Sequence, residues 1–305
     1  MIVSPIVLFV CNRPAHTLKV LSALKKNKLS KKSLLIIYLD KPIKKMDMML
    51  YLKVVKIIKN TSGFKNKKII LRKKNFGLAK NFIYGLSEVF KKYDRAIILE
   101  DDILVSPYFL DYMNKALDLY KKEKTVSSIY SYFPKTREKL PDTFFLKGSW
   151  TFVWGIGIWR RSWSLFEVDG TKLLKKIDNK NLKKKFNFNN SYDWYSMLER
   201  SINKQNQSWA IKWYASTFLN NTFTLFPKYP LSKNIGMDGT GINTPQTKIW
   251  DVTPYQKKIN VKKIKITEST AGYEAAKIFF NSIEPFYIKI YKNIKRKVYK
   301  LLYYK

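Results

Sequence analysis

Three consecutive carboxylic acids, Glu100, Asp101 and Asp102, are the residues of this sequence best suited to carry chemistry. Adjacent carboxylates repel one another, and burial raises that cost unless a cation lies between them. The triplet follows the apolar run 97–99, which has the composition of a buried strand. The chain holds only 22 acidic residues against 59 Lys and Arg. We therefore expect the triplet to bind a divalent cation, with a helix-capping turn before Pro107 as the alternative.

The rest of the sequence limits which metal this is. The chain has one Cys, Cys11, and one His, His16, so it cannot build a zinc site from the usual nitrogen and sulfur ligands. Oxygen ligands favour Mn²⁺ or Mg²⁺. A single Cys also excludes an internal disulfide. We expect Cys11 to be a small buried hydrophobic residue and His16 to lie on a helix surface.

An alternation of strands and helices predicts how the triplet is positioned. Four short apolar runs rich in β-forming residues are separated by segments with helical spacing of apolar residues. The expected strands are 5–11, 33–39, 67–72 and 95–99, and the expected helices begin at Pro14 and cover 46–60 and 78–90. This order predicts an α/β fold with a mostly parallel central sheet. Ligands of such sheets bind beyond the carboxyl ends of the strands, where Asn12, Arg13, Asp40 and the triplet follow.

The second half of the chain is less regular. Aromatic, β-rich segments cover 125–133 and 143–159, and a helix is expected at 192–203. We expect one domain over residues 1–255, with a donor half (about 1–125) and an acceptor half (about 126–255), then a basic extension over 256–305. Residues 283–305 combine apolar and Lys residues at helical spacing, which predicts an amphipathic helix that binds an anionic membrane surface or packs on the domain.

The segment 96–109 resembles the metal-binding segment of the N-acetylglucosaminyltransferase I family, whose members are inverting nucleotide-sugar glycosyltransferases. There too, an acidic triplet follows an apolar strand and precedes an apolar-Pro-aromatic segment. The resemblance continues through 6–13, 39–40, 78–90, 152–159 and 192–194, and 208–241 is similar to bacterial family 2-like sugar transferases. It covers about residues 5–245 and implies a GT-A (Rossmann-like) nucleotide-sugar-binding fold.

The resemblance also implies roles for residues on the donor side. Asp102 becomes the metal ligand, because the donor diphosphate and water can complete the coordination of the cation. The residues expected to bind the donor are Asn12, Arg13, Asp40, Lys80, Asn81, Glu100 and Asp101. Ordinary surface or turn positions remain the alternatives for Arg13, Asp40, Lys80 and Asn81.

Transfer to a hydroxyl needs a base, and Asp193 is our candidate. It lies among aromatic residues in a segment that resembles the family's catalytic-base segment, although an acid that caps a helix is the alternative. Asp238 is a second candidate base. The residues expected to contact the acceptor are Trp154, Gly155, Gly157, Trp194 and Asp238. A plain aromatic core is the alternative for the Trp residues.

The formal net charge of +37 suggests an anionic partner. Only 8 of the 59 cationic residues are Arg, the residue that nucleic-acid readers favour. We therefore expect no nucleic acid, although a basic nucleic-acid-binding protein and a Mg²⁺-dependent nucleotidyltransferase stay as alternatives. The expected function is a metal-dependent inverting transfer from a nucleotide-diphosphate sugar, a UDP-sugar, to a glycan or lipid-linked acceptor of lipopolysaccharide or capsule. We see no signal peptide and expect a cytoplasmic protein, peripheral on the inner face of the membrane.

Overall fold

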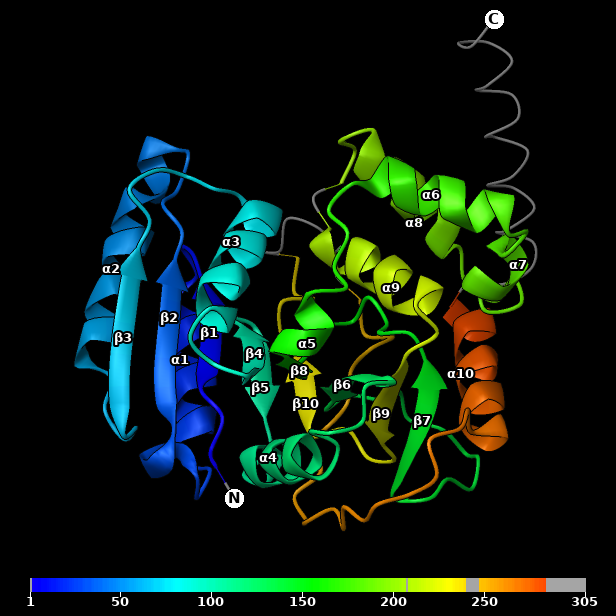
Figure 1. Cartoon of the computed structure of the whole chain (residues 1–305). Helices are drawn as coiled ribbons and strands as arrows, with labels where there is room; N and C mark the ends of the chain where they lie inside the picture. The colour runs from blue at the N-terminus through cyan, green and yellow to red at the C-terminus, as the bar shows by residue number, and fades with distance from the viewer. Residues whose placement is uncertain (1, 207, 240–246, 284–305) are drawn as a thin grey trace, which may run out of the picture.

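The computed structural model describes residues 2–206, 208–239 and 247–283, and a mixed eight-stranded sheet forms its centre (Figure 1). The strands lie in the order β3-β2-β1-β4-β8-β6-β9-β7. Their bounds are β1 Ile6–Val10, β2 Leu34–Leu39, β3 Asn66–Leu71, β4 Arg95–Glu100, β6 Val126–Tyr130, β7 Thr143–Lys147, β8 Ile156–Trp159 and β9 Phe223–Pro227. Four of the seven neighbouring pairs are parallel. The expected α/β fold with a mostly parallel sheet is confirmed.

Helices cover both faces of this sheet. Their bounds are α1 Pro14–Lys25, α2 Met48–Asn60, α3 Leu78–Phe90, α4 Phe109–Leu119, α5 Arg160–Trp163, α6 Gly170–Asn179, α7 Lys183–Phe186, α8 Trp194–Ile202, α9 Trp209–Leu219 and α10 Thr270–Ile283, with short 3₁₀ helices at Ser30–Lys32 and Lys45–Asp47. Side chains alternate along a strand, so each strand contributes to two cores. In β1, Leu8 joins the core under α1, α2 and α4. Phe9 joins the core under α3, where its ring stacks on the ring of Phe82 with 3.9 Å between the centroids.

The donor half was predicted closely from the sequence. Strand β1 pairs in parallel with β2 and with β4, and β2 pairs in parallel with β3. Helices α1, α2 and α3 make the three crossovers, as the alternating pattern predicted. The carboxyl ends of the four strands therefore share one edge of the sheet, and the polar residues that follow them are brought to that edge.

The chain reverses direction in the second half. Strand β8 is antiparallel to both of its neighbours, β4 and β6, and the outer strand β7 is antiparallel to β9. A separate two-stranded sheet joins β5 (Ile103–Val105) to β10 (Ser232–Asn234). This small sheet carries a segment from late in the chain to the residues that follow the acidic triplet.

Residues after 255 make contacts with the preceding part of the chain. The backbone N–H of Ile264 donates to the Tyr120 hydroxyl at 3.0 Å, and Ile259 is buried. Helix α10 then buries Ala276 and Phe280 in the core beneath it. Residues 256–283 thus pack against the rest of the described chain, and the division of the chain at residue 255 stays a prediction. The predicted membrane-binding helix at 283–305 lies, apart from Ile283, outside the described residues.

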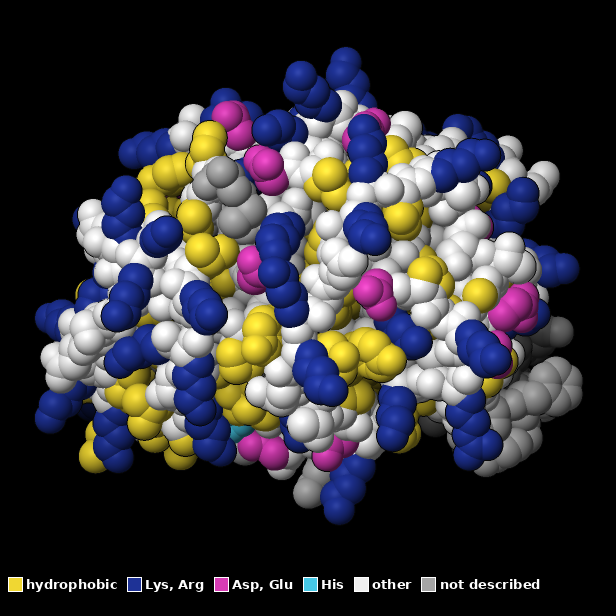
Figure 2. Space-filling model, turned by 90° about the horizontal axis from the view of Figure 1, so that it is seen from below, with side chains coloured by type: hydrophobic (Ala, Val, Ile, Leu, Met, Phe, Trp, Pro, Cys, Tyr) yellow, Lys and Arg dark blue, Asp and Glu magenta, His cyan; other side chains and the backbone are white. Residues whose placement is uncertain are grey.

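Cationic side chains cover the face of the molecule seen from below. Figure 2 shows them spread over that whole face, with apolar side chains between them, instead of gathered in one stripe. Among the described residues, none of the helices combines the length and the apolar character that crossing a membrane requires.

Candidate active site

The acidic triplet lies at the turn between β4 and β5. Glu100 ends β4, and Asp101 and Asp102 form the turn before Ile103 begins β5. Burial raises the pKa of Glu100 well above its ordinary value, and the neighbouring Asp102 adds to the effect. Burial and the charge of Asp102 likewise raise the pKa of Asp101 to about 7. Two carboxyl groups whose ionisation is this costly favour a cation beside them.

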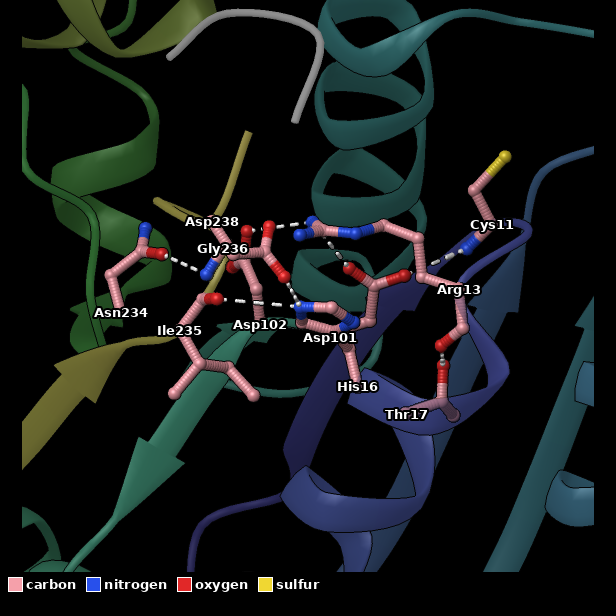
Figure 3. A network of polar contacts seen from close by, with 10 residues as sticks. All are labelled: Cys11, Arg13, His16, Thr17, Asp101, Asp102, Asn234, Ile235, Gly236 and Asp238. Atoms are coloured by element: carbon pink, nitrogen blue, oxygen red, sulfur yellow. Dashed lines mark hydrogen bonds and ion pairs between the residues drawn. The ribbon is translucent and has the colours of Figure 1, made fainter. Parts of the chain in front are cut away.

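The guanidinium of Arg13 places a positive charge beside these carboxyl groups. Its Nη1 lies 2.8 Å from Asp102 Oδ2 and 3.5 Å from Asp101 Oδ1 (Figure 3). Burial alone would lower the pKa of Arg13, but the two carboxylates raise it above its ordinary value. Asp101 is fixed from the other side by the backbone N–H of Cys11, which donates to Oδ2 at 3.2 Å. The strand end after β1 and the triplet after β4 thus form one charged cluster, as the parallel sheet predicted.

A distant segment, residues 234–238, closes this cluster (Figure 3). The backbone N–H of Ile235 donates to the carbonyl of Asp102 at 2.8 Å, and that of Gly236 donates to Asn234 Oδ1 at 2.7 Å. Gly236 lies directly against Asp102 and Arg13, so that a methyl group on its α-carbon would overlap the Asp102 carboxylate. The pairing of β10 with β5 holds the segment in this place.

His16 belongs to the same cluster, which corrects the expectation that it lies on a helix surface. Its Nε2 is 3.1 Å from Asp238 Oδ2 and 3.3 Å from the carbonyl oxygen of Ile235. The sequence held one signal for this role, since the sole His of the chain comes two residues after the Pro that follows Arg13. Asp238, predicted on the acceptor side, is therefore joined to the donor-side cluster.

The residues at this site fit a divalent cation held mainly by its substrate. Asp102 Oδ1 is buried and has no hydrogen-bond partner among the described residues, although the other oxygen pairs with Arg13. Such an orphaned carboxylate oxygen is suited to Mg²⁺ or Mn²⁺. The described residues hold no group of three or more His, Cys, Asp or Glu side chains arranged for a metal. Asp102 could therefore supply one protein ligand to such a cation.

Asp40 lies at the carboxyl end of β2, where it holds a turn in place. Its carboxylate accepts the backbone N–H groups of Lys41, Phe76 and Gly77 at 2.9–3.0 Å. Burial nevertheless raises its pKa above the ordinary value. These bonds fix the chain where α3 begins, so Asp40 positions the start of that helix whether or not it also contacts a donor.

Lys80 and Asn81, both predicted to bind the donor, have different surroundings in the first turn of α3. Lys80 is exposed, whereas Asn81 is buried and its Oδ1 accepts from Arg72 Nε at 2.9 Å. Arg72, which sequence reasoning missed, lies between the rings of Tyr38 and Phe76, 4.8 Å from each centroid. The Asn81 oxygen is therefore engaged by Arg72, and donor binding by Asn81 stays a prediction.

The predicted base Asp193 caps helix α8. Its Oδ1 accepts the backbone N–H of Ser196 at 3.2 Å and an N–H from the Asn187 amide at 3.4 Å. The structure therefore bears out the capping role that was the alternative. None of the contacts described for Asp193 joins it to the cluster of Asp102 and Arg13.

Several of the predicted acceptor residues lie in the core instead of at the site. Trp194 is fully buried, and Trp154 packs on Tyr132 with 4.5 Å between ring centroids. Gly157 sits inside β8, where a methyl group would come 3.1 Å from Leu117. Gly155 adopts φ 91° against Ser131 and Phe109. These two glycines are thus explained by close packing of protein on protein.

The cluster of carboxylates and Arg13 lies at the carboxyl ends of parallel strands, where α/β proteins of this class bind their ligands. Within that class, residues 1–146 match the model of the GNT-I family, which confirms the resemblance seen in the sequence and supports a glycosyltransferase. A search of the curated proteins found no match.

Three solved structures are similar to part of this chain. TarS of S. aureus, solved in complex with UDP-GlcNAc, is 12% identical, with a TM-score of 0.36 over 73% of this chain and 58% of that chain. A cytidylyltransferase from Leptospira borgpetersenii is 14% identical, with a TM-score of 0.34 over 59% of this chain and 65% of that chain. A protein described as a mannose-1-phosphate geranyltransferase from Thermus thermophilus is 9% identical, with a TM-score of 0.34 over 74% and 75% of the two chains. The chain thus spans less than two thirds of the first two.

Proposed function

We propose that this protein is a divalent-cation-dependent, inverting glycosyltransferase. It would move a sugar from a nucleotide-diphosphate donor, a UDP-sugar, to a hydroxyl group of a glycan or lipid-linked acceptor. The observation that carries the proposal is the cluster of Asp101, Asp102 and Arg13 at the carboxyl ends of parallel strands, with an unpartnered oxygen on Asp102 among the described residues. The family match over residues 1–146 supports the same class of reaction.

Each residue of the cluster has a part in binding a departing diphosphate. Asp102 would hold the cation, which acts as a Lewis acid toward the diphosphate oxygens when bound. Arg13 is a fixed guanidinium that can donate two hydrogen bonds to the same group. Asp101 and the Cys11 N–H keep the start of α1 in place, so that Arg13 does not need to reorganise when the donor binds.

A base must remove the proton from the acceptor hydroxyl. We propose Asp193 for this role on the resemblance, and Asp238 as the second candidate. The contact of Asp238 with His16 supports the second candidate, because it holds the Asp238 carboxylate beside α1, next to the cluster of Arg13 and Asp102. In-line attack by the activated hydroxyl inverts the anomeric centre, so an α-linked donor would give a β-linked product.

The test is hydrolysis and transfer from a panel of UDP-sugars, with Mn²⁺, Mg²⁺ or a chelator present. We expect one donor to be cleaved only with a cation, and Asp102→Asn to remove both this activity and cation-dependent donor binding. Asp94→Asn is the matched control, because the Asp94 side chain is 89% exposed and pairs with Arg160, away from the cluster. Binding of nucleic acid that weakens with salt, without cleavage of any sugar nucleotide, would overturn the proposal.

A further inference from the structure

A pocket apart from the acidic cluster is lined by residues of β7, α7, α9 and the start of α10. Its volume is about 440 Å³, which is enough for one or two sugar rings. It is lined by Lys147, Lys185, Phe188, Asn189, Tyr214, Phe218, Asn221, Glu268, Thr270 and Tyr273. None of these residues takes part in the cluster around Asp102, so the pocket needs its own explanation.

One wall of this pocket is built at a conformational cost. Phe188, Asn189 and Asn190 adopt φ values of 53°, 54° and 64°, three left-handed residues in succession. Left-handed backbone is costly for a bulky residue such as Phe and is found chiefly where surrounding contacts enforce it. Here the Phe188 ring stacks on Tyr273 with 4.1 Å between centroids. The chain thus maintains a strained turn that presents Asn189 at the mouth of the pocket.

The floor and the rim differ in chemistry. Phe218 and Tyr273 contribute partly exposed rings to the lining, and Phe188 and Tyr214 lie buried behind them. The rim carries the amides of Asn189 and Asn221, which can each donate and accept hydrogen bonds. An aromatic surface below paired amides is suited to a sugar ring, which has apolar C–H faces and hydroxyl edges.

The charged residues that line the pocket favour a sugar with a negative charge. Lys147 and Lys185 come from different elements and are both exposed at the pocket. The one acid in the lining, Glu268, is engaged on one side, since its Oε1 accepts the backbone N–H of Lys147 at 3.0 Å. Two ammonium groups against one carboxylate favour a ligand with a negative charge.

We infer that this pocket is a carbohydrate-binding subsite, separate from the reaction centre, for a saccharide unit that carries a carboxylate or a phosphate. It would hold a remote unit of the acceptor glycan, and in that respect it rests on the proposed glycosyltransferase function. Binding of the isolated saccharide does not require donor cleavage, so the two proposals can fail separately.

The test is calorimetric titration of the full chain with three probes: a glucuronyl–glucose disaccharide, glucose 6-phosphate and the neutral disaccharide cellobiose. We expect one of the two anionic probes to bind, and the pair of them distinguishes a carboxylate from a phosphate. Lys185→Gln and Asn189→Gly should each weaken that binding by about fivefold or more. Glycine suits the left-handed position of Asn189, so this variant should fold.

Two controls separate the outcomes. Lys184→Gln removes a charge from the same helix, α7, at a position outside the pocket and should bind like the wild type. Asp102→Asn should lose donor cleavage and keep saccharide binding. If cellobiose binds as tightly as the anionic probes, or if both pocket variants bind like the wild type, the inference is overturned. Failure of the wild-type protein to bind either anionic probe overturns it as well.

Discussion

The α-carbon of Gly236 lies against the carboxylate of Asp102, although 133 residues lie between them in the sequence. A methyl group at Gly236 would overlap Asp102 Oδ2 and come within 2.7 Å of Arg13 Nη2. Only glycine lets the closing segment approach the proposed cation ligand this closely. The contact therefore gives a direct way to disturb the site without touching its charges.

Gly236→Ala should impair donor binding more than stability. The added methyl group must push either the 234–238 segment or the Asp102 carboxylate away, and both changes disturb the ion pair with Arg13. We expect a loss of cation-dependent donor affinity of about tenfold or more, by calorimetry, since displaced charge-assisted contacts are costly. Gly239→Asn, in the same segment at φ 86°, is the control, because Asn tolerates left-handed backbone. Equal losses in the two variants would point to general damage to the segment.

His16 should hold the segment 234–238 against the cluster of Arg13 and Asp102. Its ring contacts both Asp238 and the carbonyl of Ile235 through Nε2. His16→Ala removes these contacts, and we expect faster amide hydrogen exchange over residues 235–238 and a donor affinity weaker by about fivefold. His16→Gln retains an N–H donor and should recover part of the affinity. Unchanged hydrogen exchange over residues 235–238 in His16→Ala would exclude this role of His16.

The variants Asp193→Asn and Asp238→Asn show which of the two residues acts as the base. Asp→Asn keeps size and most hydrogen bonding, so the variant that removes the base should lose roughly 10²–10⁴-fold in transfer rate with donor affinity unchanged. Asp193→Asn should also lower the stability slightly, because the side chain caps α8. A normal rate in Asp193→Asn together with a large loss in Asp238→Asn would assign the role to Asp238. A retained anomeric configuration would exclude a base-activated inverting attack by either residue.

The buried carboxyl group of Asp40 should make stability depend on pH. Burial raises its pKa in the folded protein above the value in the unfolded chain. Between these two values the folded state binds more protons, so the free energy of unfolding contributed by Asp40 falls as the pH rises through that interval. Urea unfolding of the wild type and of Asp40→Asn from about pH 3.5 to about pH 6.5 should show a difference in stability that changes with this sign. A difference that does not vary with pH would remove Asp40 as the cause.

The donor half of the fold could be predicted because its signals are local. The runs at β1, β2 and β4 are apolar and largely buried, and polar residues come at or just after their ends: Asn12 after β1, Asp40 after β2 and Glu100 in β4. Parallel pairing then brings Arg13 and Asp102 to one edge by geometry alone. For this reason the central part of the candidate site could be identified before the structure was known.

The remaining parts depend on contacts between segments that are distant in the sequence. The same pattern of Gly and Trp that suggests an acceptor loop also serves a tight core, and only packing shows that Gly157 faces Leu117. Residues 256–269 read as a basic extension because Lys interrupts the apolar residues, yet Ile259 and Ile264 pack on the domain. The role of His16 likewise depends on β10, which no local pattern places beside β5.

The pairing of β5 with β10 also has a consequence for biosynthesis. The four strands that present the acidic triplet are complete by residue 100, but the segment that covers the triplet is not made until residues 232–238. Because a domain generally folds as a unit, the closed cluster can form only after residues 232–238 have been made. A chain stopped just before residue 232 should therefore lack the contacts of Ile235, Gly236 and Asp238 with the cluster.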